Sequence, residues 1–419
     1  MEVVDRMKDV FIPGDLLLPR VDDMSRWSVI ACDQFTSQPE YWAKVEELVG
    51  DSPSTLRLML PEAYLSLPEQ AELSRSILRT MEDYLRKGLF RTLERSYVYV
   101  ERTRSGGGLR RGILGLLDLE AYDFREDSTS LVHATEGLVL ERIPPRLALR
   151  REASLECAHL VLFYDDPDFR ISALAARCAG ELLYDFDLML GGGHLRGRRI
   201  AAEGAEQLRI ALNRMADPEA LRSRYGDSAA PLLYAVGDGN HSLATARQNW
   251  ERIRETLTPA QWEGHPARYT LAELVDLHEP SIEFEPIHRV LFDTDEQAFL
   301  AEAALRFPAA GGEHPFRCLT ASGSLSLSVR GTIGQAISAL DAFLLDYAAR
   351  HGGRIDYIHG MADAAALCAS PGRAAVLMPE MDKRDLFPSI VTSGVLPKKS
   401  FSIGPALDKR YYLECRKIR

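Results

Sequence analysis

The sequence predicts a mixed α/β protein of the α+β type, with a large core and a smaller C-terminal α+β domain. Apolar runs of strand length alternate with segments of helical period along most of the chain. The length of 419 residues exceeds one ordinary core of about 100 to 200 residues. The composition also changes near Glu279, where Pro280 and Pro286 punctuate the chain. We therefore expect a core at residues 1–279, a small domain at 280–393 and a return to the core at 394–419.

The expected elements of the core follow from hydrophobic period and turn residues. A strand at 29–31 leads into a helix from Pro39, and an amphipathic helix is expected at 68–87. In chain order, the remaining expected elements are a hairpin at 96–101 and 111–118, a strand at 159–164, a short element at 183–189, a strand at 195–200, a strand at 232–236 and a helix at 242–250. The small domain is expected to hold helices at 296–305, 333–350 and 362–368, a hairpin at 317–319 and 325–329, and a strand at 374–378.

The turn between the last strand and helix of the core carries the most chemistry. Gly237 and Gly239 permit backbone geometry that other residues avoid, and Asp238, Asn240 and His241 lie between strand and helix. Free N–H groups and the helix dipole favour a phosphate or carboxylate at such a helix start. An alternative is a plain turn in which Asp238 or Asn240 caps the helix. Neither a dinucleotide fingerprint nor a P-loop is present.

Several motifs carry a family resemblance. They are Val29-Ile-Ala-Cys-Asp-Gln-Phe-Thr36, Arg142-Ile-Pro-Pro-Arg-Leu147, Tyr184-Asp-Phe-Asp-Leu-Met-Leu-Gly-Gly-Gly-His194, Leu233-Tyr-Ala-Val-Gly-Asp-Gly-Asn-His-Ser-Leu-Ala-Thr-Ala-Arg247 and Phe284-Glu-Pro-Ile-His-Arg-Val290. Together they resemble the uncharacterised domain-of-unknown-function family 1015 over nearly the whole chain.

The turn is also similar to the Asp-Gly-x-His-Arg-x-x-Ala segment of the ParB, sulfiredoxin and free-serine kinase group, which binds nucleotide phosphates. That likeness implies a ParB/sulfiredoxin-like nucleotide-binding core. Ser242 stands where the pattern has Arg, so a bidentate phosphate donor is missing.

We expect one pocket to gather residues from the ends of separate strands and turns. The catalytic candidates are Asp33, Glu136, Asp238 and His241. The candidates for binding nucleotide are Gly237, Gly239, Asn240, Arg142, Arg146 and Lys398. Asp33 and Asp238 are the candidate ligands for Mg²⁺. The arginines near Arg146 are equally compatible with a solvated helix face, and Lys398 with a solvated chain end.

These residues favour a phosphotransferase that uses ATP (with ADP as product) and Mg²⁺ on a small hydroxyl metabolite of a serine-like kind. The first alternative is a phosphate-ester hydrolase acting on a phosphoserine-like substrate, with His241 protonating the leaving group. The second is a nucleotide-binding or ligand-binding switch without turnover. Formation of ADP with an acceptor, release of phosphate from an ester, or binding without product would separate the three.

Composition excludes other classes. Fifty basic and 61 acidic residues give a net charge of −11, which argues against a nucleic-acid partner held by bulk electrostatics. The six cysteines lack paired spacing, so we expect neither a disulfide framework nor a zinc ribbon. Neither a signal-peptide core nor a membrane-spanning run is recognisable. A bacterial-type cytoplasmic enzyme with a small-molecule substrate is expected, and a homo-oligomer is compatible with the sequence.

Overall fold

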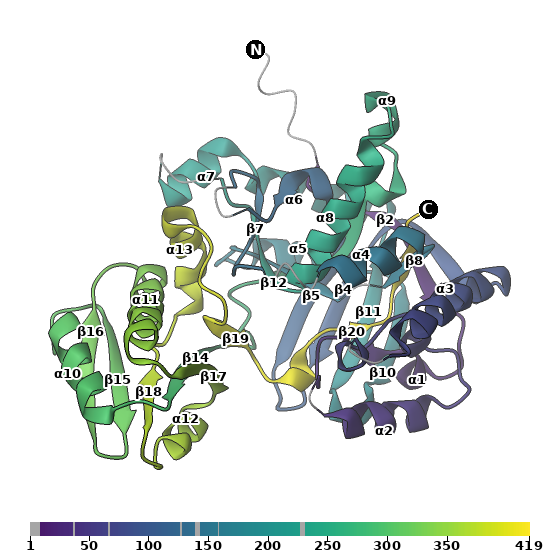
Figure 1. Cartoon of the computed structure of the whole chain (residues 1–419). Helices are drawn as coiled ribbons and strands as arrows, with labels where there is room; N and C mark the ends of the chain where they lie inside the picture. Colours follow the sequence, from purple (N-terminus) through teal and green to yellow (C-terminus); the bar gives the residue numbers. More distant parts are fainter. Residues whose placement is uncertain are drawn as a thin grey trace. The chain divides into compact units, whose positions relative to one another are not determined.

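The computed structural model describes residues 9–419 except 37, 66–67, 126–127, 139–142, 158 and 227–230, and except the side chain of Ser393. The chain forms two compact units (Figure 1). Unit 1 comprises Met1–Ala134, Leu138–Ser281 and Pro405–Arg419, and unit 2 comprises Thr135–Gly137 and Ile282–Gly404. The sequence-based division placed the boundaries after residues 279 and 393. The structure instead divides the chain after 281 and 404 and gives residues 135–137 to unit 2.

Unit 1 contains one large mixed sheet. Along its main path the strand order is β6-β7-β12-β9-β13-β5-β4-β2-β21-β8, with β1 beside β5 and the β10–β11 hairpin beside β4. Its strands are β1 Phe11–Ile12, β2 Gly14–Pro19, β4 Phe90–Thr103, β5 Leu109–Asp118, β6 Tyr122–Asp123, β7 Val132–Ala134, β8 Leu155–Cys157, β9 Leu160–Tyr164, β10 Leu182–Asp187, β11 His194–Ile200, β12 Tyr234–Asp238, β13 Tyr269–Asp276 and β21 Cys415–Lys417. A separate two-stranded ladder joins β3 Val29–Ile30 to β20 Tyr411–Tyr412.

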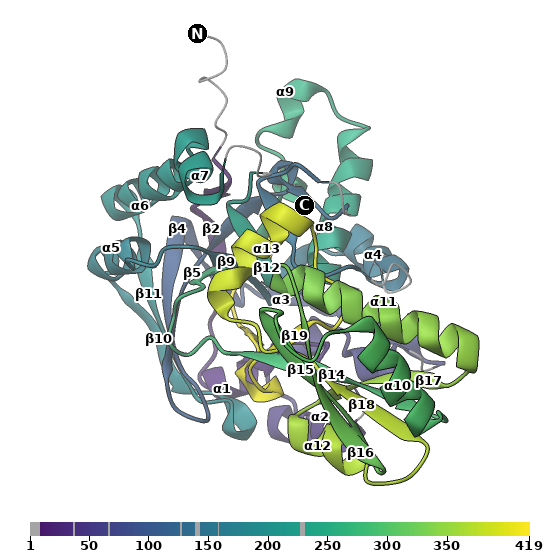
Figure 2. The same cartoon turned by 90° about the vertical axis from the view of Figure 1, so that its left-hand side faces the viewer.

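The helices of unit 1 are α1 Met24–Trp27, α2 Pro39–Val49, α3 Gln70–Arg86, α4 Ile143–Glu152, α5 Arg170–Cys178, α6 Ala202–Met215, α7 Pro218–Tyr225, α8 Asn240–Arg254 and α9 Pro259–Trp262. Helices α4 and α8 lie side by side, as Figures 1 and 2 both show. This pair borders the cavity described below.

Alternation of side chains along the central strands builds two apolar cores. On β4, Val98 and Val100 belong to one buried cluster, whereas Tyr97 and Tyr99 belong to another. Successive side chains of a strand point to opposite faces, so the two clusters lie on the two faces of the sheet. Trp250 of α8 is fully buried in the second cluster, which anchors this helix to the sheet.

Unit 2 contains an antiparallel sheet with the order β16-β15-β18-β14-β17 and with β19 beside β14. Its elements are β14 Phe284–Phe292, α10 Glu296–Arg306, β15 His314–Thr320, β16 Gly323–Val329, α11 Ile333–His351, β17 Arg354–His359, α12 Met361–Leu367, β18 Arg373–Leu377, α13 Leu386–Ser393 and β19 Phe401–Ile403. The predicted mixed α/β class is therefore confirmed. Among the described residues, we find no helix with the length and apolar character that a membrane crossing requires.

Candidate functional site

The predicted strand, turn and helix around Asp238 are confirmed. Strand β12 ends at Asp238, Gly239 occupies the N-cap with φ 83°, and α8 begins at Asn240. The interpretation that Asp238 or Asn240 caps the helix is wrong. No side chain caps α8, and Asp238 Oδ1 instead accepts a hydrogen bond from the N–H of Gly239 at 2.9 Å.

Both glycines of the turn are required by packing against the neighbouring strand. A Cβ atom added at Gly237 would lie 2.6 Å from the Phe163 ring, and one at Gly239 would lie 2.5 Å from Leu160 Cδ2. The positive φ of Gly239 adds a second reason, since L side chains rarely adopt it. The structure thus explains these glycines by close approach of protein to protein, and their predicted nucleotide contact stays a prediction.

Antiparallel pairing places His159 beside this turn. Strands β12 and β9 run antiparallel, with Asp238 opposite Val161, so the end of β12 meets the start of β9. His159 directly precedes β9 and is 6% exposed. A Cβ atom at Gly239 would lie 3.3 Å from His159 Nε2, which shows how closely this ring borders the turn.

The C-terminal segment brings a lysine to the same place. Strand β20 pairs with β3, and the N–H of Ala31 donates to the carbonyl of Arg410 at 3.0 Å. Asp33 follows β3, and Lys409 lies two residues before the start of β20. Lys409 Nζ lies 3.7 Å from Asp238 Oδ2, and the two side chains are only 17% and 15% exposed. Asp33, Asp238, His159 and Lys409, called the charged cluster below, thus come from four separate segments.

The two carboxylates of the charged cluster have opposite pKa shifts. Burial raises the pKa of Asp238, the nearby charge of Asp33 adds to the shift, and Lys409 and His159 only partly oppose it. Burial also acts against ionisation of Asp33, but His159, the hydrogen bond from Gln34 and Lys409 together hold the Asp33 pKa below its ordinary value. Paired groups whose environments separate their pKa values are typical of acid and base roles.

Two buried oxygens of the turn lack hydrogen-bond partners. Among the described residues, Asp238 Oδ2 and Asn240 Oδ1 are shielded from solvent and accept no hydrogen bond. Buried polar atoms are nearly always satisfied, so such orphans call for an explanation such as a catalytic role or a ligand. Both stand at the start of α8, where the first backbone N–H groups have no acceptor within the helix.

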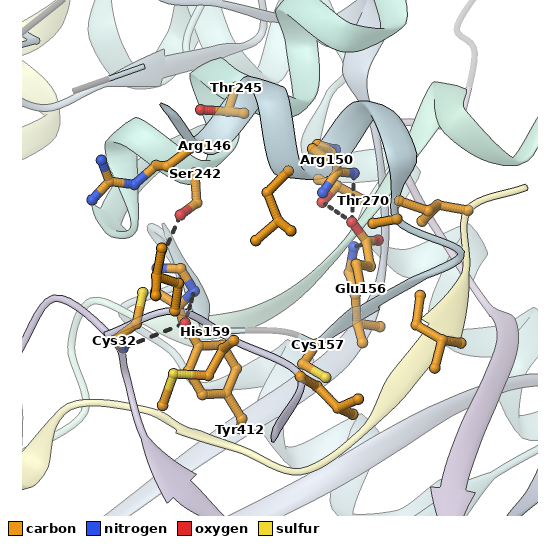
Figure 3. A pocket seen from close by; sticks show the side chains of 18 of the residues that line it. Cys32, Arg146, Arg150, Glu156, Cys157, His159, Ser242, Thr245, Thr270 and Tyr412 are labelled. Carbon is orange, nitrogen blue, oxygen red and sulfur yellow. Dashed lines mark hydrogen bonds and ion pairs between the residues drawn. The ribbon is translucent and has the colours of Figure 1, made fainter. Parts of the chain in front are cut away.

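A cavity of about 160 Å³ opens beside the charged cluster (Figure 3). Its walls include Ser242 and Thr245 of α8, Arg146 and Arg150 of α4, and His159. Much of the remaining lining is aliphatic: Leu58, Leu60, Met81, Leu149, Leu155, Leu271 and Ile418. The lining is thus mainly apolar, and most of its polar groups come from α4, from α8 and from the strands that carry Glu156 and Thr270.

The cationic groups on the wall are paired with acids. Arg150 Nη2 lies 2.5 Å from Glu156 Oε2, and Arg416 Nη1 lies 3.2 Å from Glu156 Oε1. Arg146 forms an ion pair with Glu62. Arg146 and Arg150 are therefore each paired with an acid of the cavity wall, whereas the neighbouring Arg151 is exposed.

Buried ions hold the C-terminal segment in place. The Arg102 guanidinium, 1% exposed, donates to the carbonyls of Asp408 at 3.2 Å, Gly192 at 2.8 Å and Leu407 at 2.5 Å, and also to that of Lys409. Arg410 pairs with Glu273 and, at 2.7 Å, with Glu414. These contacts fix the backbone from which Lys409 projects.

The remaining predicted residues have different surroundings. Glu136 belongs to unit 2, where its carboxylate accepts the N–H groups of Lys399 at 3.2 Å, Ser400 at 3.0 Å and Phe401 at 3.5 Å. Lys398 also belongs to unit 2, and Arg142 lies outside the described residues. His241 is the second residue of α8, half-buried, and its carbonyl accepts from Thr245 Oγ1 at 2.6 Å.

The structure thus gathers Asp33, Asp238 and the start of α8 within unit 1, together with two residues absent from the predicted set. His159 and Lys409 escaped the sequence analysis. His159 read as the first residue of an apolar strand, and Lys409 lay in an ordinary basic stretch. The one available signal for Lys409 was the expected return of the C-terminus to the core.

A metal site of protein ligands alone is not seen in the part of the chain that the structure describes. No three His, Cys, Asp or Glu side chains gather there in a way that holds a metal ion. Mg²⁺ usually binds through one or two carboxylates together with phosphate oxygens and waters. The predicted Asp33 and Asp238 pair has this character and stays a prediction.

The family model for a protein of unknown function, DUF1015, matches residues 17–347. The chain belongs to the DUF1015 family. The predicted membership is confirmed over most of the sequence. A search of curated proteins finds no match.

Solved structures give distant likenesses. A free serine kinase mutant in complex with ADP has 9% identity and a TM-score of 0.40, covering 76% of this chain and 95% of its own. A free serine kinase mutant in complex with AMP has 11% identity and a TM-score of 0.38, covering 72% and 91%. C-terminally truncated SbnI from Staphylococcus aureus has 8% identity and a TM-score of 0.29, covering 60% and 82%.

Proposed function

We propose that this protein is a nucleotide-dependent phosphotransferase that acts on a small hydroxyl metabolite, similar to serine in size. Unit 1 is proposed as a ParB/sulfiredoxin-like nucleotide-binding core, with the phosphates of ATP at the start of α8. The observation that carries the proposal is the pair of unsatisfied buried oxygens, Asp238 Oδ2 and Asn240 Oδ1, beside Lys409. Two buried acceptors that lack hydrogen bonds cost stability, even though one of them has a 3.7 Å ion pair with Lys409, so the arrangement is expected where a ligand completes it.

The start of α8 supplies donors for phosphate oxygens. Its first-turn N–H groups point away from the helix, and the helix dipole favours an anion there. Lys409 adds a cation that is held by the buried network around Arg102 and Arg410. A preorganised cation near a transferring phosphoryl group stabilises the charge that develops on its oxygens.

The carboxylates fit a divalent cation. Asp33, whose pKa is held low, offers an ionised ligand, and Asp238 Oδ2 accepts no hydrogen bond and is paired with Lys409 Nζ at 3.7 Å. Mg²⁺ held by Asp33 and Asp238 would neutralise charge on the nucleotide phosphates. A cation would also lower the pKa of Asp238 and so relieve the effect of its burial.

The cavity is assigned to the acceptor. Its volume of about 160 Å³ is below the roughly 300–1,000 Å³ of pockets that hold drug-sized ligands. A three-carbon hydroxyl metabolite fits such a space, whereas a whole nucleotide does not. His159 and Ser242 form one polar part of the cavity wall, where the hydroxyl of an acceptor would find hydrogen-bond partners.

Ligand binding tests the proposal directly. Thermal-shift titrations with ATP, ADP and CTP, each with and without Mg²⁺, should show stabilisation by an adenine nucleotide that Mg²⁺ enhances. A ligand at about 100 times its dissociation constant adds roughly 2.7 kcal/mol to the folded state. Asp238→Asn should abolish the Mg²⁺-dependent part, because it removes a charged oxygen with little change of shape.

Asp22→Asn is the matched control, because Asp22 is exposed and lies in the loop before α1. The control should retain the full nucleotide shift. If wild type shows no shift with any nucleotide, the phosphotransferase proposal fails. A shift from phosphoserine alone, with phosphate released on incubation, would instead favour the phosphate-ester hydrolase. Nucleotide binding without any product would favour a switch protein.

A further inference from the structure

Ser242 and His159 form a hydrogen-bonded pair that the charged cluster does not explain. Ser242 is the third residue of α8, and its Oγ lies 3.2 Å from His159 Nε2. Both side chains line the cavity (Figure 3). A hydroxyl within hydrogen-bond distance of an imidazole, at the wall of a cavity, is the arrangement of a nucleophile and its base.

A third group orients the imidazole. His159 Nδ1 lies 3.2 Å from the Tyr412 hydroxyl, and that hydroxyl accepts a hydrogen bond from the N–H of Cys32 at 3.4 Å. With the proton on Nδ1 donated to the Tyr412 oxygen, His159 Nε2 carries the lone pair that faces Ser242. Tyr412 is 4% exposed and belongs to β20, so its position is fixed by the sheet. The hydrogen bonds to Tyr412 and Ser242 therefore define the orientation of the His159 ring.

The surroundings keep His159 able to accept a proton. Burial lowers the pKa of His159, which favours the neutral imidazole that accepts a proton. Asp33 and Asp238 oppose that shift and would stabilise the imidazolium once it forms, whereas Arg146 and Arg410 act in the opposite sense. A buried base with nearby carboxylates is thus deprotonated at rest and stabilised when it takes a proton.

We propose that Ser242 is a catalytic nucleophile with His159 as its base, and that it carries the phosphoryl group between donor and acceptor. This inference rests on the proposed phosphotransferase function. Ser242 shares the first turn of α8 with the N–H groups assigned to the phosphates, so its hydroxyl lies next to the group to be transferred. Ser242 occupies the position where the resembling pattern has Arg. A reactive hydroxyl at this position would form a covalent bond to the phosphoryl group, whereas the Arg of the pattern would only bind it.

The reaction balances in two steps. Ser242 Oγ attacks the terminal phosphorus of ATP, the bond to the bridging oxygen breaks, and ADP leaves with the electron pair. The Ser242 proton passes to His159 Nε2 and then to solvent. In the second step the acceptor hydroxyl attacks the phosphoserine phosphorus. His159 takes the acceptor proton and delivers it to Ser242 Oγ, which leaves with its electron pair and regenerates the serine.

A fluorophosphonate reagent tests the nucleophile without any nucleotide. Ser242 attack on phosphorus with loss of fluoride should give a stable adduct, which tandem mass spectrometry would locate at Ser242. Ser242→Ala should abolish the adduct, and His159→Gln should slow its formation by about 10²-fold or more. Ser76→Ala is the matched control, since Ser76 is an exposed serine of α3 and does not line the cavity. The control should react at the wild-type rate.

Phosphorylation of the protein tests the relay. Incubation of the full chain with ATP and Mg²⁺ and no acceptor should give phosphoserine at Ser242. Absence of the fluorophosphonate adduct in wild type and in Ser76→Ala would overturn the assignment of Ser242 as a nucleophile. ADP formation with an acceptor but no phosphoserine at Ser242 would overturn the relay and leave the phosphotransferase standing. No ADP under any condition, with the adduct present, would overturn the phosphotransferase and the relay together.

Discussion

Gly239→Ala probes the turn at the centre of the site. The change adds a single methyl group at a residue with φ 83°, beside Leu160 and His159. An alanine in the left-handed region costs about 1–2 kcal/mol. Its Cβ would also lie 2.5 Å from Leu160 Cδ2 and 3.4 Å from Leu160 Cα. Overpacking of this kind costs about 1–3 kcal/mol. We therefore expect the free energy of unfolding to fall by about 2–5 kcal/mol in total.

Gly107→Ala separates backbone strain from the steric clash. Gly107 has φ 88°, and no atom lies within 4 Å of a Cβ added there. This control should lose only the backbone contribution of about 1–2 kcal/mol. The effect of an added Cβ on the unfolded chain is the same in both variants and cancels in the comparison.

Urea unfolding followed by tryptophan fluorescence is the assay. All four tryptophans, at 27, 42, 250 and 262, belong to unit 1, where both substitutions lie. The signal therefore reports the unfolding of that unit. Gly239→Ala should be less stable than Gly107→Ala by about 1–3 kcal/mol. Equal stabilities of the two variants would refute the close packing of the turn against β9.

Three further predictions concern buried groups elsewhere. Burial and the neighbouring Asp166 raise the pKa of Asp276 to about 7. The folded state therefore keeps a proton that the unfolded chain loses near its ordinary value of 3.8, so wild-type stability should fall as pH rises from about 4 to 7. Above pH 7 the free energy of unfolding of Asp276→Asn should exceed that of wild type by about 4 kcal/mol at most. Urea unfolding at pH 5 and pH 8 would measure this difference. A difference that does not change with pH would contradict the raised pKa of Asp276. Arg102→Met should destabilise unit 1 by about 3–5 kcal/mol in the same unfolding assay, because it leaves buried carbonyls unsatisfied. A loss of stability below about 1 kcal/mol, the range of a surface ion pair, would refute the role of Arg102 in holding the C-terminal segment. The Cys157 and Cys415 sulfurs lie 3.0 Å apart on paired strands, so oxidised glutathione should join them in a disulfide. A thiol titration should then count two fewer free thiols in wild type, and Cys415→Ser should prevent this loss. Persistence of all six thiols in wild type would exclude the disulfide.

The sequence predicts the local part of the site well. Strand β12, the turn and helix α8 follow from apolar period and from two glycines within a few residues. The reason for those glycines was not predictable, because it lies in contacts with Phe163 and Leu160. A glycine pattern indicates an unusual backbone, but only the neighbouring strand tells whether a ligand or a side chain occupies the space.

The long-range part of the site was hidden from the sequence. His159 lies beside the turn because β9 and β12 pair antiparallel in one register. The sequence of one strand does not predict the register in which it pairs with another. Lys409 reaches Asp238 through a segment 171 positions further along the chain, held by carbonyl contacts to Arg102. Every residue has a backbone carbonyl, so the sequence does not show which carbonyls accept hydrogen bonds from Arg102.

Glu136 illustrates the reverse case. The sequence analysis predicts a catalytic role for Glu136. In the structure its carboxylate accepts three consecutive backbone N–H groups of residues 399–401 within unit 2. A carboxylate that organises a loop and one that binds a metal look the same in a sequence, because they differ only in the groups that surround them in the fold.

Detection of a phosphorylated product tests the central claim most directly. Wild type, Asp238→Asn and the Asp22→Asn control would be incubated with ATP, Mg²⁺ and a panel of small hydroxyl metabolites that includes serine. ADP and the phosphorylated acceptor would be measured by mass spectrometry. The account predicts equal amounts of ADP and phosphorylated acceptor from wild type and from Asp22→Asn, and a loss of at least about 10²-fold in Asp238→Asn. Equal turnover by Asp238→Asn, or no ADP above background with any acceptor in wild type, would contradict it.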